Sequence, residues 1–281
     1  MVIKLNGGSA DLHMVSLVDM QKLSDSIQKI SYNHEYQMHG TRDKTIYITA
    51  NKEGSFEMNL GLIDPNHLSM VLDGVQGAFL YDLIKKMGEY LNSEASRDNI
   101  KKLLDETFTL ALELVEAEYF DVKFEKKKQT IENNTKLINA ELANYQAMKQ
   151  ITSIVGDSSN TSSLKPTSIE FIASAKNEEE KLIINTQTKE LLENNEVEAI
   201  KLENIVISGV PDNLSRSGKS FYMEVAFVGK IKIRASDKHL SVVSDYFKEQ
   251  KSIKIKIEPI VRMGELIKTR DAKLIKIIEE E

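Results

Sequence analysis

The sequence predicts an α+β protein with a mainly helical N-terminal domain that contains a β-hairpin, followed by a β-rich C-terminal domain. Over most of the first 155 residues, apolar side chains recur at three- and four-residue spacing, as in amphipathic helices. Beyond residue 166 they alternate with polar residues in short runs, as in half-buried strands. Residues 156–166 between these regions are mostly small and polar. We therefore expect domains at 1–155 and 167–281, joined by a linker.

The composition is that of an ordinary folded protein. The chain has 281 residues, of which 41% are hydrophobic and 28% charged, enough for two domains with their own cores. Cysteine is absent, which excludes disulfides, thiolate nucleophiles and cysteine-ligated metals and fits a reducing cytoplasm. The first residues lack a signal-peptide pattern, and no apolar run is long enough to cross a membrane. We expect a cytoplasmic protein without a membrane partner.

The first region begins with a predicted strand, helix and hairpin. Val2–Leu5 has the pattern of a short strand. Ser16 and Asp19 have capping-box spacing and predict the start of a helix whose apolar stripe continues to about Tyr32. In residues 46–62, a β-branched run, a turn sequence and an alternating run follow one another, which predicts an antiparallel hairpin.

Further helices are predicted before the linker. Residues 99–118 carry apolar side chains around much of a helix, and residues 130–155 resume helical spacing. Between them, Val122–Phe124 predicts a short extended piece.

A helix at residues 67–90 is a candidate interaction surface. Its apolar stripe includes small residues, which allow another backbone to approach closely. The candidate contact residues are Gly74, Gly77, Ala78 and Tyr81.

Strands dominate the region beyond the linker. The predicted strands are 168–173, 181–184, 198–208, 220–228, 230–234, 252–258 and 272–278, with helices at 188–194 and 239–247. Pro211–Lys219 is expected to be an exposed loop. A small antiparallel sheet or a partly open barrel accommodates this order of elements.

Two of these runs alternate cations with isoleucines. At a period of two, the isoleucines lie on one face of a sheet and the cations on the other. From Val197 onward there are 16 Lys and Arg against 13 Asp and Glu, whereas the preceding residues hold 21 against 30. Such a face can bind an anion or track a nucleic-acid backbone; the alternative is an ordinary solvated face. The candidate residues are Lys230, Lys232, Arg234, Lys254 and Lys256.

Motifs with known chemistry are incomplete, so we assign no catalytic residue, cofactor or metal ligand. Ser217–Ser220 resembles the end of a phosphate-binding loop, but Asn213 stands where that loop needs glycine. His34 and His39 are five residues apart, where a helical zinc motif needs four. Acidic runs at 113–121 and 178–180 indicate solvated surface unless their carboxylates converge in a pocket.

The order of elements resembles a set of uncharacterised bacterial proteins from mobile-element and phage-defence neighbourhoods. The shared features are an N-terminal helix, a hairpin with Gly54-Ser55-Phe56, a glycine-containing helix at Gly74–Ile84 and a β-rich C-terminal region. The resemblance implies a bacterial protein of antiviral defence or a mobile element, and no catalytic residues.

Three functional hypotheses follow. We prefer a non-enzymatic protein that assembles with itself or with another protein, because no catalytic set is complete and two helices offer broad apolar surface. The second is a nucleic-acid or nucleotide-ligand binding module that uses the cationic face of the C-terminal sheet. The third is a metal-dependent hydrolase, which requires carboxylates that converge.

Overall fold

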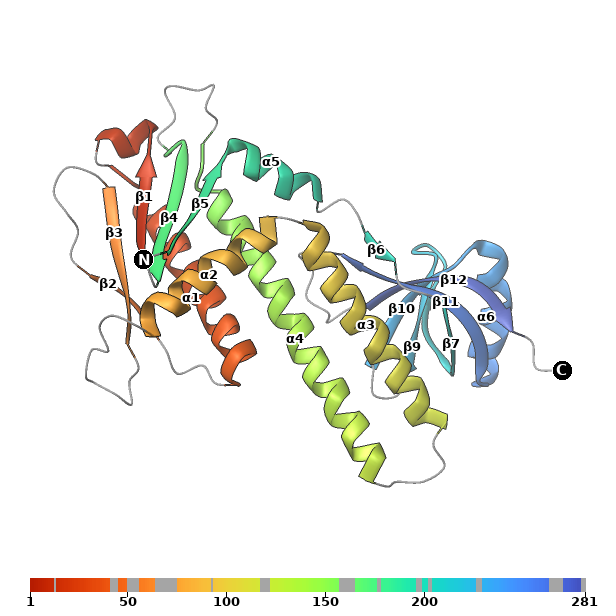
Figure 1. Cartoon of the computed structure of the whole chain (residues 1–281). Coiled ribbons are helices and arrows are strands. Elements are labelled where there is room, and N and C mark those ends of the chain that lie inside the picture. The colour runs from red at the N-terminus through yellow and green to blue at the C-terminus, as the bar shows by residue number, and fades with distance from the viewer. Residues whose placement is uncertain are drawn as a thin grey trace. The chain divides into compact units, whose positions relative to one another are not determined.

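The computed structural model has an α+β fold, as the sequence predicts, and its chain divides into two compact units (Figure 1). The described residues are 1–12, 14–40, 45–49, 56–63, 75–91, 93–116, 122–156, 165–175, 178–195, 199–201, 204–225, 229–262 and 270–278. Unit 1 comprises Met1–Ser96 and Ala140–Val197, and unit 2 comprises Arg97–Asn139 and Glu198–Glu281. In the described helices, none is both long and apolar enough to cross a membrane.

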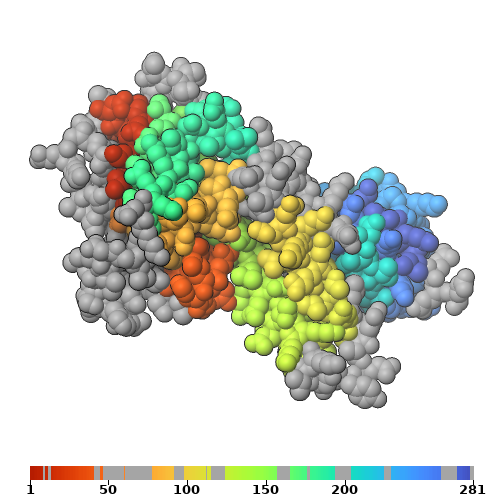
Figure 2. Space-filling view, viewed as in Figure 1, coloured from red at the N-terminus to blue at the C-terminus, as the bar shows by residue number. Residues whose placement is uncertain are grey.

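Unit 1 is built on a five-stranded antiparallel sheet of order β2-β3-β1-β4-β5. Its strands are β1 (Val2–Asn6), β2 (Thr45–Thr49), β3 (Phe56–Ile63), β4 (Ser168–Ala175) and β5 (Glu178–Asn185). The first strand is central, since Ile3 pairs in register with Met58 on β3 and with Phe171 on β4. In Figure 2 the red surface of β1 accordingly adjoins the green surface of β4 and β5.

This pairing corrects the predicted domain boundary. The sequence assigns β4 and β5 to the C-terminal domain, but both strands belong to the sheet of unit 1. The predicted linker at residues 156–166 therefore does not separate the two units. The physical reason is that β1 pairs along both of its edges. Its second edge is paired, from Val2 to Asn6, by β4, which begins 162 residues after β1 ends.

One face of this sheet is buried by helices. Alternate residues of β1 and β4, including Ile3, Ile169 and Phe171, are fully buried. Helix α2 (Val75–Leu91) packs on β4 and β5, and helix α1 (Leu17–His39) contacts α2 and β2. A short helix, α5 (Thr186–Asn195), follows β5.

Helix α1 has the predicted N-terminus but is longer than its apolar stripe indicates. The Ser16 hydroxyl oxygen accepts a hydrogen bond from the Asp19 backbone N–H at 3.0 Å, as the capping box requires. The helix continues past Tyr32 to a left-handed cap at Gly40. Its last turns carry buried polar residues, such as Asn33, which an apolar period does not reveal.

Two glycines with the same backbone angle give a matched pair of stability tests. Gly7 and Gly40 both have φ of 72°. An added methyl group at Gly40 meets nothing within 4 Å, whereas at Gly7 it collides with the Thr167 side chain. That side chain is held by a hydrogen bond from its hydroxyl to the Asn6 carbonyl at 3.1 Å. Both changes to alanine require a left-handed conformation that alanine disfavours.

Gly40→Ala is expected to lower the free energy of unfolding by about 1 kcal/mol, the usual cost of a left-handed alanine. Gly7→Ala is expected to lower it by about 3 kcal/mol, because a steric clash adds to the same backbone strain. Urea unfolding followed by circular dichroism measures both values. Equal losses in the two variants would contradict the close approach of Gly7 to Thr167.

A buried hydrogen-bonded chain joins three helices of unit 1. Asn33 on α1 donates to the Asn144 side-chain oxygen at 2.7 Å, and the Asn144 amide donates to the Tyr90 hydroxyl at 2.8 Å. Asn144 lies on helix α4 (Val122–Thr152) and Tyr90 on α2. Both residues are fully buried. Burial, together with the nearby Glu141 carboxylate, raises the pKa of Tyr90 above its ordinary value, so the hydroxyl stays neutral.

An ion-paired lysine lies beside this chain. Lys86 Nζ is 3.3 Å from a Glu141 carboxylate oxygen and 3.0 Å from Glu89, and the Gln37 amide donates to Glu141 at 2.8 Å. Burial alone would lower the pKa of Lys86, but the two carboxylates outweigh it and the pKa is raised. The cluster therefore fixes how α1, α2 and α4 face one another.

The helical part of unit 2 corrects a second expectation. Val122–Phe124, expected to be extended, is the first turn of α4, which continues through residues 122–139 of unit 2 into unit 1. Helix α3 (Ser93–Glu116) is joined to this part of α4 by a hydrogen bond from Asn134 to Glu106 at 3.2 Å. Because the apolar residues of a short helical turn and of a strand have similar patterns, the sequence alone did not separate them.

The remaining strands of unit 2 form a sheet that closes on itself. They are β6 (Ala199–Lys201), β7 (Ile205–Gly209), β8 (Pro211–Ser215), β9 (Ser220–Val225), β10 (Gly229–Arg234), β11 (Ile253–Arg262) and β12 (Arg270–Ile278). The order is β7-β11-β12-β10-β9-β8, with β6 beside the end of β11. A single residue, Val210, separates β7 from β8, so one bent strand pairs with β11 at its start and with β9 at its end. A Cβ atom at Gly209 would lie 3.3 Å from the Glu224 carbonyl oxygen of β9, which shows how close the two ends approach.

The result is a five-stranded barrel, counting β7 and β8 as one strand and leaving out the short β6, which pairs with the end of β11. Helix α6 (Asp237–Glu249) connects the third strand, β10, to the fourth, β11, and the fifth, β12, lies between them. This connectivity is that of the OB-fold, a Greek-key barrel. The expected barrel is thus present, but β10 and β12 are parallel, so the sheet is mixed rather than antiparallel. Pro211–Ser215, expected to be a loop, is the strand β8 that closes it.

Candidate nucleic-acid interface

The structure places the five predicted cations on the outer face of this barrel. The side chains between them point inward and are buried: Ile231, Ile233, Ile253, Ile255 and Ile257. Because side chains alternate across a strand, Lys230, Lys232 and Arg234 on β10 and Lys254 and Lys256 on β11 lie on the opposite, outer face.

The two cationic strands are not neighbours in the sheet. Strand β12 lies between β10 and β11 and adds two exposed lysines, Lys273 and Lys276, which our sequence interpretation did not include. The sequence did contain a signal for these two lysines, because residues 272–278 were predicted to be a strand with lysines among apolar residues. What the sequence lacked was the strand order that brings β12 between the other two.

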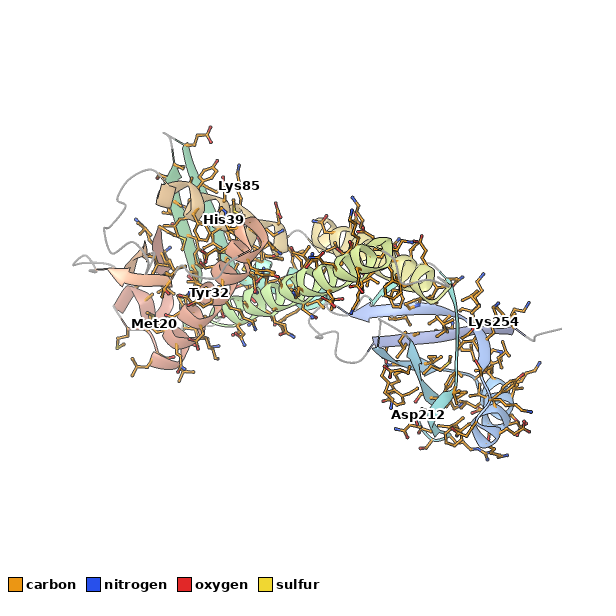
Figure 3. The ribbon with its side chains drawn as sticks, turned by 90° about the horizontal axis from the view of Figure 1, so that it is seen from below. Met20, Tyr32, His39, Lys85, Asp212 and Lys254 are labelled. Carbon is orange, nitrogen blue, oxygen red and sulfur yellow. The ribbon has the colours of Figure 1, made fainter. Side chains whose placement is uncertain are left out.

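On β10 the outer cations are largely neutralised. Lys230 Nζ is 2.6 Å from the Asp212 carboxylate of β8, and an Arg234 guanidinium nitrogen is 2.6 Å from the Asp271 carboxylate of β12. The hydrogen bond that Lys230 donates to the Asp212 carboxylate raises the pKa of Lys230. Figure 3 labels Asp212 and Lys254, which lie on different strands of the barrel. These ion pairs are exposed, so each contributes little to stability, but each removes a cation from the surface field.

On β11 and β12 the lysines are not neutralised. Lys256 stands directly opposite Lys276 in the register of the two strands, and Lys254 follows two residues away on the same face. Lys254 and Lys276 are exposed and Lys256 is half-buried. Within the described residues none of the three makes an ion pair. We refer to Lys254, Lys256 and Lys276 as the unpaired lysine cluster.

Like charges directly opposite one another destabilise a sheet. The structure therefore carries a local electrostatic cost at Lys256 and Lys276 that an anion on the outer face would remove. The neighbouring cross-strand position differs, since Lys273 stands opposite Glu258. The unpaired lysine cluster is thus a smaller and more strongly positive patch than the five-residue face that the sequence indicates.

One aromatic ring accompanies the cations. Tyr222 on β9 is half-buried and stands opposite Lys232 on β10 and Asp212 on β8. Lys230 Nζ lies 5.4 Å from the centroid of its ring. Phe221, the neighbouring residue on β9, faces the barrel interior and is fully buried.

The described part of the candidate interaction helix is α2. Gly74 lies outside the described residues, while Gly77 and Ala78 are in the first turns of α2. The apolar side chains of this helix, such as Phe79 and Leu83, are buried within unit 1. Its packing on β4 and β5 explains the apolar stripe.

Tyr81 contacts residues of its own unit. Its hydroxyl donates to a Glu178 carboxylate oxygen at 3.1 Å, and Lys85 Nζ lies 4.8 Å from its ring centroid (Lys85 is labelled in Figure 3). Glu178 belongs to the acidic run at 178–180, which forms the start of strand β5.

In the described parts of the chain, the residues of the incomplete motifs do not come together in one site. Gly218 lies in the β8–β9 turn and is followed by a strand, not by the helix that a phosphate-binding loop needs. His34 is buried beside Phe79, whereas His39 is exposed at the end of α1, and burial lowers the pKa of His34. Glu113 pairs with Lys127 at 2.6 Å. No group of three or more His, Asp or Glu among the described residues is arranged to hold a metal ion.

Comparison of the chain with protein-family models, with curated proteins and with solved structures found no match. The argument for function therefore rests on the site itself.

Proposed function

We propose that the chain is a non-enzymatic protein that binds single-stranded nucleic acid on the outer face of the unit 2 barrel. The observation that carries this proposal is the unpaired lysine cluster, in which Lys256 and Lys276 stand directly opposite each other without a carboxylate partner in the described structure. A phosphate backbone would supply the missing negative charge.

The spacing of the cations favours a nucleic-acid backbone. Lys254 and Lys256 are two residues apart on one strand, which separates them by about 6.6 Å. This distance is comparable with the spacing of neighbouring phosphates along an extended single strand. A barrel surface also suits a single strand better than a duplex, because duplex readers insert a helix or a β-ribbon into a groove.

The barrel connectivity supports the same function by analogy of fold. OB-folds bind oligonucleotides or oligosaccharides on the face of their second and third strands and on adjoining loops. Here those strands are β9 and β10, whereas the unpaired lysine cluster lies on the fourth and fifth strands, β11 and β12. Fold does not by itself imply function, so this analogy only adds to the argument from charge. Tyr222 on β9 offers a ring on which a base can stack, a contact worth about 1–3 kcal/mol per base in single-strand binders.

The assembly hypothesis is less well supported by the geometry. It was motivated by the apolar surfaces of α2 and α3, and the described apolar residues of α2 are buried against unit 1's own sheet. Self-association stays a prediction from the sequence. The cytoplasm, with its reducing conditions, is the compartment in which we expect a cysteine-free protein of this kind to act.

The proposal is tested by fluorescence anisotropy with labelled oligothymidylate of about 20 nucleotides. We expect the logarithm of the association constant to fall linearly with the logarithm of the salt concentration, with a slope of about −2. Each of the three lysines would neutralise one phosphate, and each such contact contributes about −0.7 to the slope. The absence of binding at about 50 mM salt, for both DNA and RNA oligonucleotides, would contradict the proposal. Tighter binding to a duplex of the same length would contradict the proposed preference for single-stranded nucleic acid.

A further inference from the structure

We propose that the side chain of Ile275 contacts the bases of the bound single strand while the unpaired lysine cluster binds its phosphates. This role rests on the function proposed for the barrel, and it narrows the ligand from polyanions in general to strands with accessible bases. The supporting observation is a β-bulge in β12, which places a large apolar side chain on the outer face beside the lysines.

The bulge interrupts the antiparallel pairing of β11 with β12, two strands that lie side by side in Figure 1. Ile257 stands opposite Leu274, whereas its neighbour Lys256 stands opposite Lys276. Ile275 is therefore an extra residue of β12, and no described residue of β11 pairs with it. Bulges of this kind re-aim a side chain and are common next to functional sites.

The extra residue puts two neighbouring side chains on one face of the sheet. In a regular strand, Ile275 and Lys276 would point to opposite faces. Here both are exposed, Ile275 by 38%, while the preceding Leu274 is only 4% exposed. The bulge therefore displays an isoleucine directly beside a lysine of the unpaired lysine cluster.

Two further apolar side chains lie on the same face. Val206 on β7 stands opposite Lys256, Ile278 on β12 stands opposite Lys254, and both apolar residues are half-buried. Residues opposite one another in an antiparallel pair share a face of the sheet, so apolar and cationic side chains are interleaved across three neighbouring strands. Single exposed apolar residues are common on protein surfaces. An exposed isoleucine among lysines that make no ion pair in the described structure instead favours a ligand that is both anionic and apolar.

A single-stranded nucleic acid has both of these properties. Its phosphates are anionic, and the faces of its unpaired bases are apolar surfaces that are stabilised by packing against a side chain. In a duplex the bases stack on one another, so their faces are not accessible to Ile275. Polyphosphates and sulfated polysaccharides supply only charge, so we expect them to bind more weakly than a base-bearing strand of equal charge.

The contact with the bases is tested with the full chain by fluorescence anisotropy. The two probes are oligothymidylate of about 20 nucleotides and an abasic oligonucleotide of the same length and charge, at about 50 mM salt. We expect the abasic strand to bind about tenfold more weakly with the same salt slope, because the phosphate contacts are unchanged. Equal affinities would overturn the contact with the bases and leave the lysines as a phosphate site. Failure of both strands to bind would overturn the function proposed for the barrel itself.

Two variants assign the contact to position 275. Ile275→Ser is expected to weaken oligothymidylate binding about fivefold and to leave the affinity for the abasic strand unchanged. Ile275→Phe offers a ring on which a base can stack, and it is expected to strengthen oligothymidylate binding about fivefold, again without an effect on the abasic strand. A gain in affinity cannot result from misfolding. Unchanged oligothymidylate affinity in both variants would overturn the role of Ile275.

Val242→Ser is the matched control. Val242 is 39% exposed, close to the value for Ile275, and lies on helix α6 of the same unit. Its replacement is expected to change neither affinity, and a loss equal to that of Ile275→Ser would overturn the assignment to the bulge. A second measurement uses vesicles of equal parts phosphatidylcholine and phosphatidylserine. Binding to these vesicles that Ile275→Phe strengthens, with no change for oligothymidylate, would assign the face to a membrane surface and overturn the proposal.

Discussion

Simultaneous replacement of Lys254, Lys256 and Lys276 by glutamate is expected to weaken oligothymidylate binding about a hundredfold or more at about 50 mM salt. The change removes the unpaired lysine cluster, whose three cations make no ion pair with any described residue, and puts repulsive charges in their place. The side chains lie on the outer face of the barrel, so the buried isoleucines between them are untouched. Fluorescence anisotropy measures the affinity, and the salt slope of any remaining binding is expected to approach zero.

A matched control has the same change in net charge on the same unit. Lys238, Lys248 and Lys251 are exposed and lie on α6 or directly after it, away from the outer face of β11 and β12. Their joint replacement by glutamate is expected to change the affinity by less than about threefold, since screening limits the reach of surface charges to about 10 Å. Equal losses in the two triple variants would show that net charge, and not the unpaired lysine cluster, determines binding.

Asn144→Leu is expected to lower the free energy of unfolding by about 3 kcal/mol. The substitution removes two buried hydrogen bonds, one from Asn33 at 2.7 Å and one to the Tyr90 hydroxyl at 2.8 Å. Each buried hydrogen bond that is lost costs about 1–3 kcal/mol, and two are lost here, although the Asn33 amide keeps a longer bond of 3.5 Å to the Ala140 carbonyl. Tyr90 cannot compensate by ionising, because burial raises its pKa. Urea unfolding, followed by circular dichroism, measures the loss.

The same substitution elsewhere in α4 is the control. Asn134 is also buried, but it makes a single side-chain hydrogen bond, at 3.2 Å, to the Glu106 carboxylate. Glu106 is exposed and remains solvated after the change. Asn134→Leu is therefore expected to cost only about 1 kcal/mol. A loss for Asn144→Leu that does not exceed this value would mean that the chain through Asn33, Asn144 and Tyr90 does not stabilise unit 1.

Local structure could be read from the sequence because its causes are local. The capping residues Ser16 and Asp19 predicted the start of α1, and the structure has that cap. Alternation predicted the hairpin at residues 46–62 and the strands that became β9, β10, β11 and β12. The same alternation correctly predicted that the isoleucines at 231, 233, 253, 255 and 257 would be buried and the cations between them outward.

The candidate site was only partly predictable. Lys254 and Lys256 were recognised from their spacing, but Lys276 was not, because its importance depends on its position opposite Lys256. The neutralisation of Lys230 and Arg234 likewise depends on Asp212 and Asp271, which belong to other strands.

The sequence by itself determined most of the strands and helices, the buried face of β10 and β11, and the presence of a cationic surface on unit 2. It did not determine the helical turn at Val122–Phe124 or the strand Pro211–Ser215. Only the tertiary structure decided that β4 and β5 join β1 in unit 1, that β7 and β8 close the barrel, and that Lys256 faces Lys276 with no ion pair to either in the described part of the chain. The physical reason is the range of the interactions. A side-chain period is set by residues two to four positions apart, whereas strand order, register and ion pairing are set by contacts between residues far apart in the chain.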